Sequence, residues 1–137
     1  MSNILQKICD DKSKELEETK KRCSFKTLEK LISSKLEKRE FKDQLISAQK
    51  NKKNLIIGEV KKQSPSAGEI ISDYKPEDIA ILYERSGIGA LSILTESKYF
   101  LGNIDHLSRV KKKTNLPILR KDFIIDKYQI LESKIYQ

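Results

Sequence analysis

Three short apolar segments constrain the fold of this chain more than any other feature. They begin near residues 55, 90 and 116, and each is followed by a segment whose apolar residues recur at helical spacing. The order strand, helix, strand, helix, strand, helix favours right-handed crossovers and a parallel sheet. We therefore predict an α/β fold, although this order alone fits a barrel and a doubly wound sheet equally well.

Local signals predict where the first helix of this series begins and ends. Pro76 suits the first helical turn, where its missing N–H costs nothing, and the helix runs to Arg85. Gly87 stands where a C-terminal cap belongs. The strand before it, within residues 55–60, has no polar alternation until Glu59. That pattern predicts a parallel strand covered on both faces.

The two later helices carry capping signals. Asn103 is expected to cap a helix that contains Leu107 and Val110. Asp126 and Gln129 have the spacing of a capping box for a last helix. Each predicted strand is thus followed by one predicted helix.

The first 50 residues have a different character, because they contain no glycine and no proline. Their apolar residues recur at helical spacing and predict two or three helices with a narrow apolar stripe. We therefore divide the chain into a helical extension, residues 1–50, and a β/α region, residues 51–137.

Positive charge is concentrated in the first part of the chain. Residues 1–53 hold 15 basic and 9 acidic residues, whereas residues 54–137 hold 13 and 11. A solvated lysine-rich helical surface explains this excess, because acids are interleaved with the lysines. A basic module that binds RNA is the alternative, and its binding would weaken with added salt.

Other composition signals suggest a protein of the cytoplasm. No apolar stretch is long enough for a membrane helix, and the N-terminus lacks a signal-peptide core. Cys9 and Cys23 are expected to be free thiols. The single histidine, His106, is expected to be exposed in mid-helix, without a role, and no metal site is predicted.

Three charged residues are candidates for chemistry. Glu59 and Lys61, two apart, lie on one side at the end of the first strand, and Lys121 ends the third strand. Ligands of parallel α/β folds bind at the carboxyl ends of the strands. The three side chains offer a base and two acids, or charge that holds an anionic substrate. A purely structural ion pair between Glu59 and Lys61 is the alternative.

Three further residues are candidates for substrate binding. Ser64 lies in the loop of residues 63–68, which offers hydroxyl and N–H groups to a phosphate, although an ordinary turn has the same composition. Phe100 and Phe123 follow the second and third strands. They suit an apolar wall for an aromatic ligand, or packing of the core.

Three sequence blocks identify a family resemblance. The block 59–68 reads EVKKQSPSAG and resembles the E-x-K-K-x-S-P-S-x-G signature of indole-3-glycerol-phosphate synthases. The segments SILTE (92–96) and YFLG (99–102) resemble the second-strand motif of that family. The block 116–126, LPILRKDFIID, followed by YQI at 128–130, resembles its third-strand motif. The helical leader also resembles the extension that precedes the barrel in this family.

The resemblance implies a fold and a reaction. The fold is the N-terminal half of a (β/α)8 TIM barrel behind a helical extension, with three β/α units and the barrel incomplete. The reaction, that of a carbon-carbon lyase in tryptophan biosynthesis, converts 1-(2-carboxyphenylamino)-1-deoxyribulose 5-phosphate to indole-3-glycerol phosphate by ring closure, decarboxylation and dehydration. The family uses no metal and no organic cofactor.

The resemblance also implies residue roles. Lys121 matches the general acid of ring closure, Lys61 matches the lysine that contacts the substrate carboxylate and acts in dehydration, and Glu59 matches a carboxylate that transfers protons. Ser64 matches a substrate-contacting serine. Phe100 and Phe123 match positions that line the anthranilate pocket.

Length sets an expectation about activity. A (β/α)8 barrel takes about 250 residues, and the resemblance places strands four to eight outside these 137 residues. We expect the chain to be inactive by itself. The alternatives are the N-terminal half of a split synthase that needs a partner chain, an active homo-oligomer of half-barrels, and a non-enzymatic basic binding module.

Overall fold

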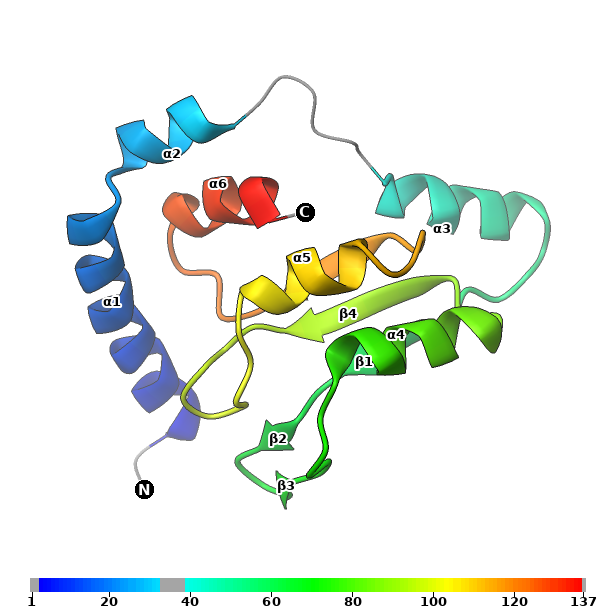
Figure 1. Ribbon diagram of the computed structural model, residues 1–137, viewed down its shortest axis with the longest axis horizontal. Coiled ribbons are helices and arrows are strands. Elements are labelled where there is room, and N and C mark those ends of the chain that lie inside the picture. Colours follow the sequence, from blue (N-terminus) through cyan, green and yellow to red (C-terminus); the bar gives the residue numbers. More distant parts are fainter. Residues whose placement is uncertain (1–2, 33–38, 137) are drawn as a thin grey trace. The chain divides into compact units, whose positions relative to one another are not determined.

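A computed structural model describes residues 3–32 and 39–136. The chain divides into two compact units, one made of residues 1–36 and 123–136 and the other of residues 37–122. Figure 1 shows the elements along the chain. The predicted boundary at residue 50 between a helical extension and a β/α region is not tested by this division and stays a prediction.

The unit of residues 37–122 is built on a three-stranded parallel sheet. Strand β4 (Ala90–Leu94) lies between β1 (Ile57–Val60) and β5 (Ile118–Lys121). In this register Glu59 is level with Ser92, and Ser92 is level with Leu119. The predicted α/β class and the parallel sheet are therefore confirmed.

Two helices cover one face of this sheet. Helix α4 (Pro76–Arg85) packs against β1, α5 (Asp105–Lys111) packs against β5, and the two helices contact each other (Figure 1). Arg109 of α5 joins α4 through Glu77, with Nη2 at 2.6 Å and 2.8 Å from the two carboxylate oxygens. Pro76 begins α4 as predicted, and Gly87 follows it with a φ of 81°.

Strand alternation gives the sheet two chemically different faces. The face against α4 and α5, here called the helix face, carries Gly58, Val60, Leu91, Ile93, Ile118 and Arg120. The opposite face, here called the site face, carries Ile57, Glu59, Ala90, Ser92, Leu94, Leu119 and Lys121. The core of this unit lies between the helix face and the two helices, where Val60, Leu91, Ile93, Ala80, Leu107 and Val110 are fully buried.

The prediction that the first strand is covered on both faces is wrong for β1. Ile57 is 44% exposed on the site face, as is Leu119 of β5 at 47%. Of the strands that the structure describes, β4 alone is buried along its whole length. The reason is position in the sheet, because β4 has a strand on each side, whereas β1 and β5 are edge strands within the part of the chain that the structure describes.

Three smaller elements complete this unit. Helix α3 (Phe41–Lys50) precedes the sheet and has no buried residue. Residues 63–68, predicted as a loop, instead contain most of a two-residue ladder between β2 (Gln63–Ser64) and β3 (Gly68–Glu69). Gly68 has a φ of 67°, a conformation that glycine adopts readily, and this lets the chain reverse there.

In its described residues, the other unit has helices and no strand. It contains α1 (Ile4–Arg22), α2 (Phe25–Leu31) and α6 (Lys127–Tyr136). Leu16, Leu28 and Tyr128, one from each helix, form its buried core. The Tyr128 hydroxyl donates to the Cys23 carbonyl at 2.9 Å, and the buried position raises the pKa of Tyr128 to about 12.

Polar contacts within this unit hold the start of α6. Lys20 of α1 lies 2.5 Å from Asp126, and this hydrogen bond lowers the pKa of the Asp126 carboxyl. The predicted capping box is present, because Asp126 accepts from the Tyr128 N–H at 2.8 Å and Gln129 accepts from the Asp126 N–H at 3.1 Å.

Cys9 and Cys23 are free thiols. None of the helices described is long and apolar enough to cross a membrane.

His106 differs from its prediction, because it is 8% exposed rather than at the surface. Its ring lies 5.5 Å from the ring of Tyr74, in the segment before α4. The helical pattern of α5 could not predict that Tyr74 would cover the His106 side chain, since Tyr74 comes from a distant part of the sequence. Burial lowers the pKa of His106, Arg109 lowers it further, and Glu77 and Asp105 oppose the shift.

We predict that the buried leucine of α5 stabilises the fold and that an exposed leucine of α4 does not. Leu107 is fully buried, whereas Leu82 is 62% exposed. Leu107→Ala should lower the free energy of unfolding by about 2–5 kcal/mol, because it leaves a cavity. Leu82→Ala is the matched control and should change it by less than about 0.5 kcal/mol. Urea denaturation followed by circular dichroism measures both, and equal losses would contradict the packing described.

We also predict a pH dependence of stability that arises from His106. Its pKa is lowered in the folded chain, so the unfolded chain binds the proton first as the pH falls. The free energy of unfolding should therefore be level above the ordinary histidine pKa of 6.5 and decrease as the pH falls through the folded value. Because the sequence has one histidine, His106→Gln should flatten this part of the profile. A His106→Gln profile identical to that of the unaltered chain would show that another group titrates.

Candidate functional site

The charged cluster forms at the carboxyl ends of the strands on the site face. Glu59 belongs to β1, Lys61 is the first residue after β1, and Lys121 is the last residue of β5. Strands β1 and β5 are separated by β4, so the backbones lie about 10 Å apart. Glu59 is level with Ser92 of β4 and Lys121 is level with Leu94, so the long Lys121 side chain reaches diagonally across β4 to Glu59.

Glu59 pairs with both lysines. The Lys61 ammonium lies 2.6 Å from Oε1 of Glu59, and the Lys121 ammonium donates to Oε2 of the same carboxylate. Each carboxylate oxygen therefore has its own lysine. The structural ion pair that was the alternative interpretation of Glu59 and Lys61 is present, but it is part of a three-residue cluster that remains partly open to solvent, with Lys121 50% exposed.

The cluster fixes the charge of its carboxylate. Partial burial raises the pKa of Glu59, but hydrogen bonds from Lys121 and Lys61 outweigh burial, and the pKa of Glu59 is lowered from 4.5. Glu59 is therefore ionised at neutral pH. Two ammonium donors beside one ionised acceptor can give a proton, accept one, or bind an anionic group in place of the internal pairing.

Ser64 lies in β2, at the beginning of the short ladder that follows β1. Its hydroxyl oxygen accepts from the Ala67 N–H at 3.1 Å and lies 3.4 Å from the Ser66 hydroxyl. This arrangement is the ordinary turn that was the alternative interpretation. A role of Ser64 in substrate binding stays a prediction.

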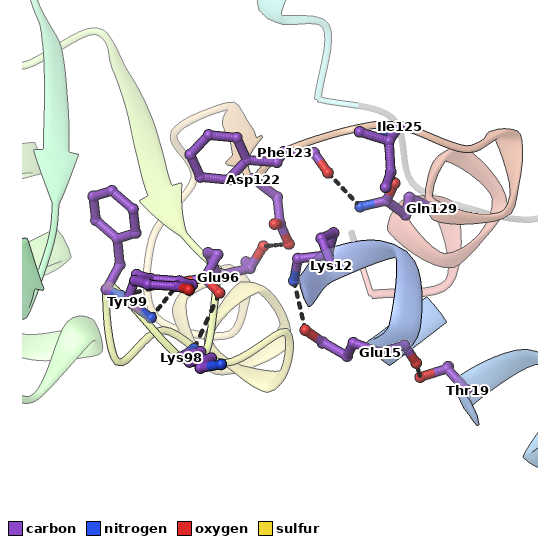
Figure 2. A network of polar contacts seen from close by, with 12 residues as sticks. Lys12, Glu15, Thr19, Glu96, Lys98, Tyr99, Asp122, Phe123, Ile125 and Gln129 are labelled. Atoms are coloured by element: carbon purple, nitrogen blue, oxygen red, sulfur yellow. Dashed lines mark hydrogen bonds and ion pairs between the residues drawn. The ribbon is translucent and has the colours of Figure 1, made fainter. Parts of the chain in front are cut away.

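Glu96 organises the loop after β4, a role that its sequence did not predict. Its buried carboxylate accepts from the N–H groups of Lys98 at 3.1 Å, Tyr99 at 2.7 Å and Phe100 at 3.0 Å (Figure 2). The Gly102 N–H closes the loop on the Glu96 carbonyl at 2.7 Å. The signal in the sequence was an acidic residue two to four positions before the N–H groups it caps, a spacing that many surface loops share.

This loop carries Phe100, one of the two predicted aromatic residues. Its backbone is held by Glu96, and its side chain is half-buried. The neighbouring Tyr99 carbonyl accepts from Nε2 of Gln63 at 3.3 Å, so β2 and the loop after β4 are in contact. A position of the Phe100 ring against a substrate stays a prediction.

Phe123 belongs to the helical unit. Its carbonyl accepts from Nε2 of Gln129 at 2.8 Å, so its backbone is fixed by the first turn of α6 (Figure 2). The structure thus brings together Glu59, Lys61 and Lys121. The role of Phe123 in lining a pocket stays a prediction.

We predict that Lys121 is responsible for part of the shift at Glu59. Lys121→Met should raise the pKa of the Glu59 carboxyl toward its ordinary value, because one hydrogen bond and one charge are lost. A pH titration of the labelled glutamate carboxyl carbons by NMR measures this. Lys113→Met, an exposed lysine after α5, is the control and should leave the titration unchanged. An unchanged Glu59 midpoint in Lys121→Met would contradict the pairing.

Comparison with known proteins gives the family. The sequence model of the family described as indole-3-glycerol phosphate synthase matches residues 5–137. Similar curated proteins carry the same description: one from Clostridium acetobutylicum is 47% identical over 96% of this chain and 49% of its own length. One from Aliarcobacter butzleri is 41% identical over 97% of this chain and 51% of its own. One from Endomicrobium trichonymphae is 45% identical over 96% of this chain and 50% of its own.

These matches also show how much of each relative the chain represents. It spans about half the length of the curated relatives that it matches. The match includes every residue of the charged cluster and both loops described above. The chain therefore belongs to the indole-3-glycerol phosphate synthase family and corresponds to the N-terminal half of its members.

Proposed function

We propose that this chain supplies the acid–base cluster of an indole-3-glycerol-phosphate synthase. The observation that carries the proposal is the pairing of Glu59 with Lys61 and Lys121 at the carboxyl ends of two parallel strands. Family membership supports the same reaction, but the chain covers about half of its relatives. The activity therefore belongs to an assembly of this half with the remaining strands.

The proposed substrate is 1-(2-carboxyphenylamino)-1-deoxyribulose 5-phosphate. A bond forms between the ring carbon that bears the carboxylate and the substrate carbonyl carbon, the carbonyl oxygen takes a proton, carbon dioxide leaves, and loss of water completes the indole. The substrate is anionic and aromatic. A cluster with two ammonium groups suits its carboxylate, and apolar side chains suit its ring.

Each residue of the cluster has a proposed role in this sequence. Lys121 donates a proton to the carbonyl oxygen during ring closure. Lys61 holds the substrate carboxylate and later assists the departure of water. Glu59, ionised at neutral pH, accepts and returns protons and keeps both ammonium groups at the reacting end until the substrate arrives.

Three residues are proposed for binding rather than chemistry. Phe100 and Phe123 line the pocket for the anthranilate ring, and Ser64 contacts the substrate from the first loop. The backbone of Phe100 is held by the Glu96 carboxylate, which supports a fixed wall rather than a mobile one.

We propose the N-terminal half of a (β/α)8 barrel as the parent architecture. The described sheet has three parallel strands, each followed by a helix, and its site face carries exposed apolar residues such as Ile57 and Leu119. In a closed barrel the interior is packed with such side chains. The remaining strands would cover them and pair with the edges of β1 and β5, whether they belong to the same polypeptide or to a partner chain.

We also propose that an isolated half, whose barrel is not closed, is inactive. Phosphate sites of these barrels are commonly built by the loops after the last two strands. A half that presents the acid–base cluster without the phosphate site would bind the substrate weakly and orient it poorly. We therefore propose that this chain alone is catalytically silent.

We predict that activity appears only when the second half is supplied. The C-terminal half of the Clostridium acetobutylicum relative, the part beyond its match to this chain, is a suitable complement because the matched halves are 47% identical. Formation of indole-3-glycerol phosphate is followed by fluorescence. Neither half should turn over alone, and the mixture should be active.

The same mixture tests the role of Lys121. Lys121→Met should lower the turnover of the mixture by about 10²–10⁴-fold, the usual contribution of a positioned general acid. Lys113→Met is the matched control and should leave turnover unchanged. Turnover by this chain alone would contradict the proposed silence, and full activity of the Lys121→Met mixture would contradict the proposed role.

A further inference from the structure

A buried polar ring lies behind Lys121, on the other side of the sheet. Arg120 points to the helix face because alternate residues of a strand point in opposite directions, and Asp122, the residue after β5, pairs with it there. Their side chains are only 7% and 1% exposed, and Nη2 of Arg120 lies 3.0 Å from Oδ2 of Asp122. The ion pair therefore joins the residues immediately before and after Lys121.

Thr95, the residue after β4, closes this ring. Its hydroxyl donates to Oδ2 of Asp122 at 2.7 Å and accepts from Nε of Arg120 at 3.1 Å. Its backbone N–H donates to the carbonyl of Lys121 at 3.0 Å. Thr95 thus contacts three consecutive residues of the third strand end, with Lys121 in the middle.

We propose that Thr95, Arg120 and Asp122 are positioning residues that aim Lys121 at Glu59. Half of the Lys121 side chain is exposed, so its own surroundings restrict it little. The backbone at residue 121 sets the direction of the Lys121 side chain. The ring holds this backbone through Arg120 before it, through Asp122 after it, and through the Thr95 N–H, which donates to the Lys121 carbonyl. The inference rests on the proposed function only for its catalytic meaning, because the orientation itself is a property of this chain.

The chemistry of the ring favours positioning over stabilisation. A buried ion pair is commonly no more stabilising than apolar residues of the same volume, since both charges lose their hydration. A ring in which one hydroxyl gives to a carboxylate and takes from a guanidinium has one arrangement of donors and acceptors. Its effect is to select a single geometry of the strand end.

The test removes the hydroxyl and reads the charge on the opposite face. Thr95→Val keeps the shape and deletes both hydrogen bonds of the hydroxyl, and Thr95→Ser restores them. In the full chain, the pH midpoint of the Glu59 carboxyl is measured by carbon NMR. We expect Thr95→Val to move this midpoint upward, toward the ordinary glutamate value, and Thr95→Ser to return it to that of the unaltered chain.

A matched control separates positioning from general loosening. Val110→Ala removes buried volume from α5, behind the same sheet, and should lower stability without moving the Glu59 midpoint. Should Thr95→Val leave the midpoint in place, or Val110→Ala move it equally, the proposal is overturned. A second measurement needs no variant: the Arg120 Nε–H of the unaltered chain should exchange with solvent as slowly as the amides of β4, and rapid exchange also overturns the proposal.

This readout is independent of turnover. If the complemented enzyme is inactive but the Glu59 midpoint shifts as expected, the proposed function fails and the positioning stands. If the complemented enzyme is active and Thr95→Val leaves both turnover and midpoint unchanged, the positioning fails and the function stands.

Discussion

The structure depends on the pairing of β4 with a parallel strand on each side. Because β4 is central, all five of its residues are buried. Its register determines which residues of β1 and β5 lie level with each other. That register places the carboxyl ends of β1 and β5 at one edge. Residues 62 apart in sequence, Glu59 and Lys121, become partners only through this central strand.

The two faces of the sheet have different roles, since one packs against helices and the other carries the charged cluster. The helix face holds the apolar contacts with α4 and α5 and the buried polar ring of Thr95, Arg120 and Asp122. The site face holds the charged cluster around Glu59. Alternation along a strand connects the two, because each residue fixed on one face restrains its neighbour on the other.

Most of the fold could be predicted from the sequence, since its signals are local. Pro76 and the capping pair of α6 mark helix starts that depend on neighbouring backbone groups. The Asp105 N–H donates to the Asn103 side chain at 2.9 Å, but Ile104 holds the N-cap position of α5, so Asn103 lies one residue before the cap. The sequence predicted a covered Ile57 and an exposed His106, and both predictions were wrong. Both are set by segments distant in sequence, the central strand in one case and Tyr74 in the other.

The candidate site was predictable to a different extent. Spacing placed Glu59 beside Lys61, and the parallel order placed Lys121 at the same edge. The contact of both lysines with one carboxylate needed the register, which depends on β4. Glu96 and Thr95 were not found, because an acidic or hydroxyl side chain that bonds to nearby backbone or to another strand resembles any loop residue until the chain is folded.

Gln129 illustrates how a side-chain amide can act as a template for a chain reversal. Its oxygen accepts from two successive N–H groups, those of Ile125 and Asp126, at 2.8 Å and 3.1 Å, while its nitrogen donates to the Phe123 carbonyl at 2.8 Å. Only a group with an acceptor at one end and a donor at the other serves both needs. A glutamate at this position would keep the shape and the acceptor but lose the donor, so a carboxylate oxygen would face the Phe123 carbonyl and repel it.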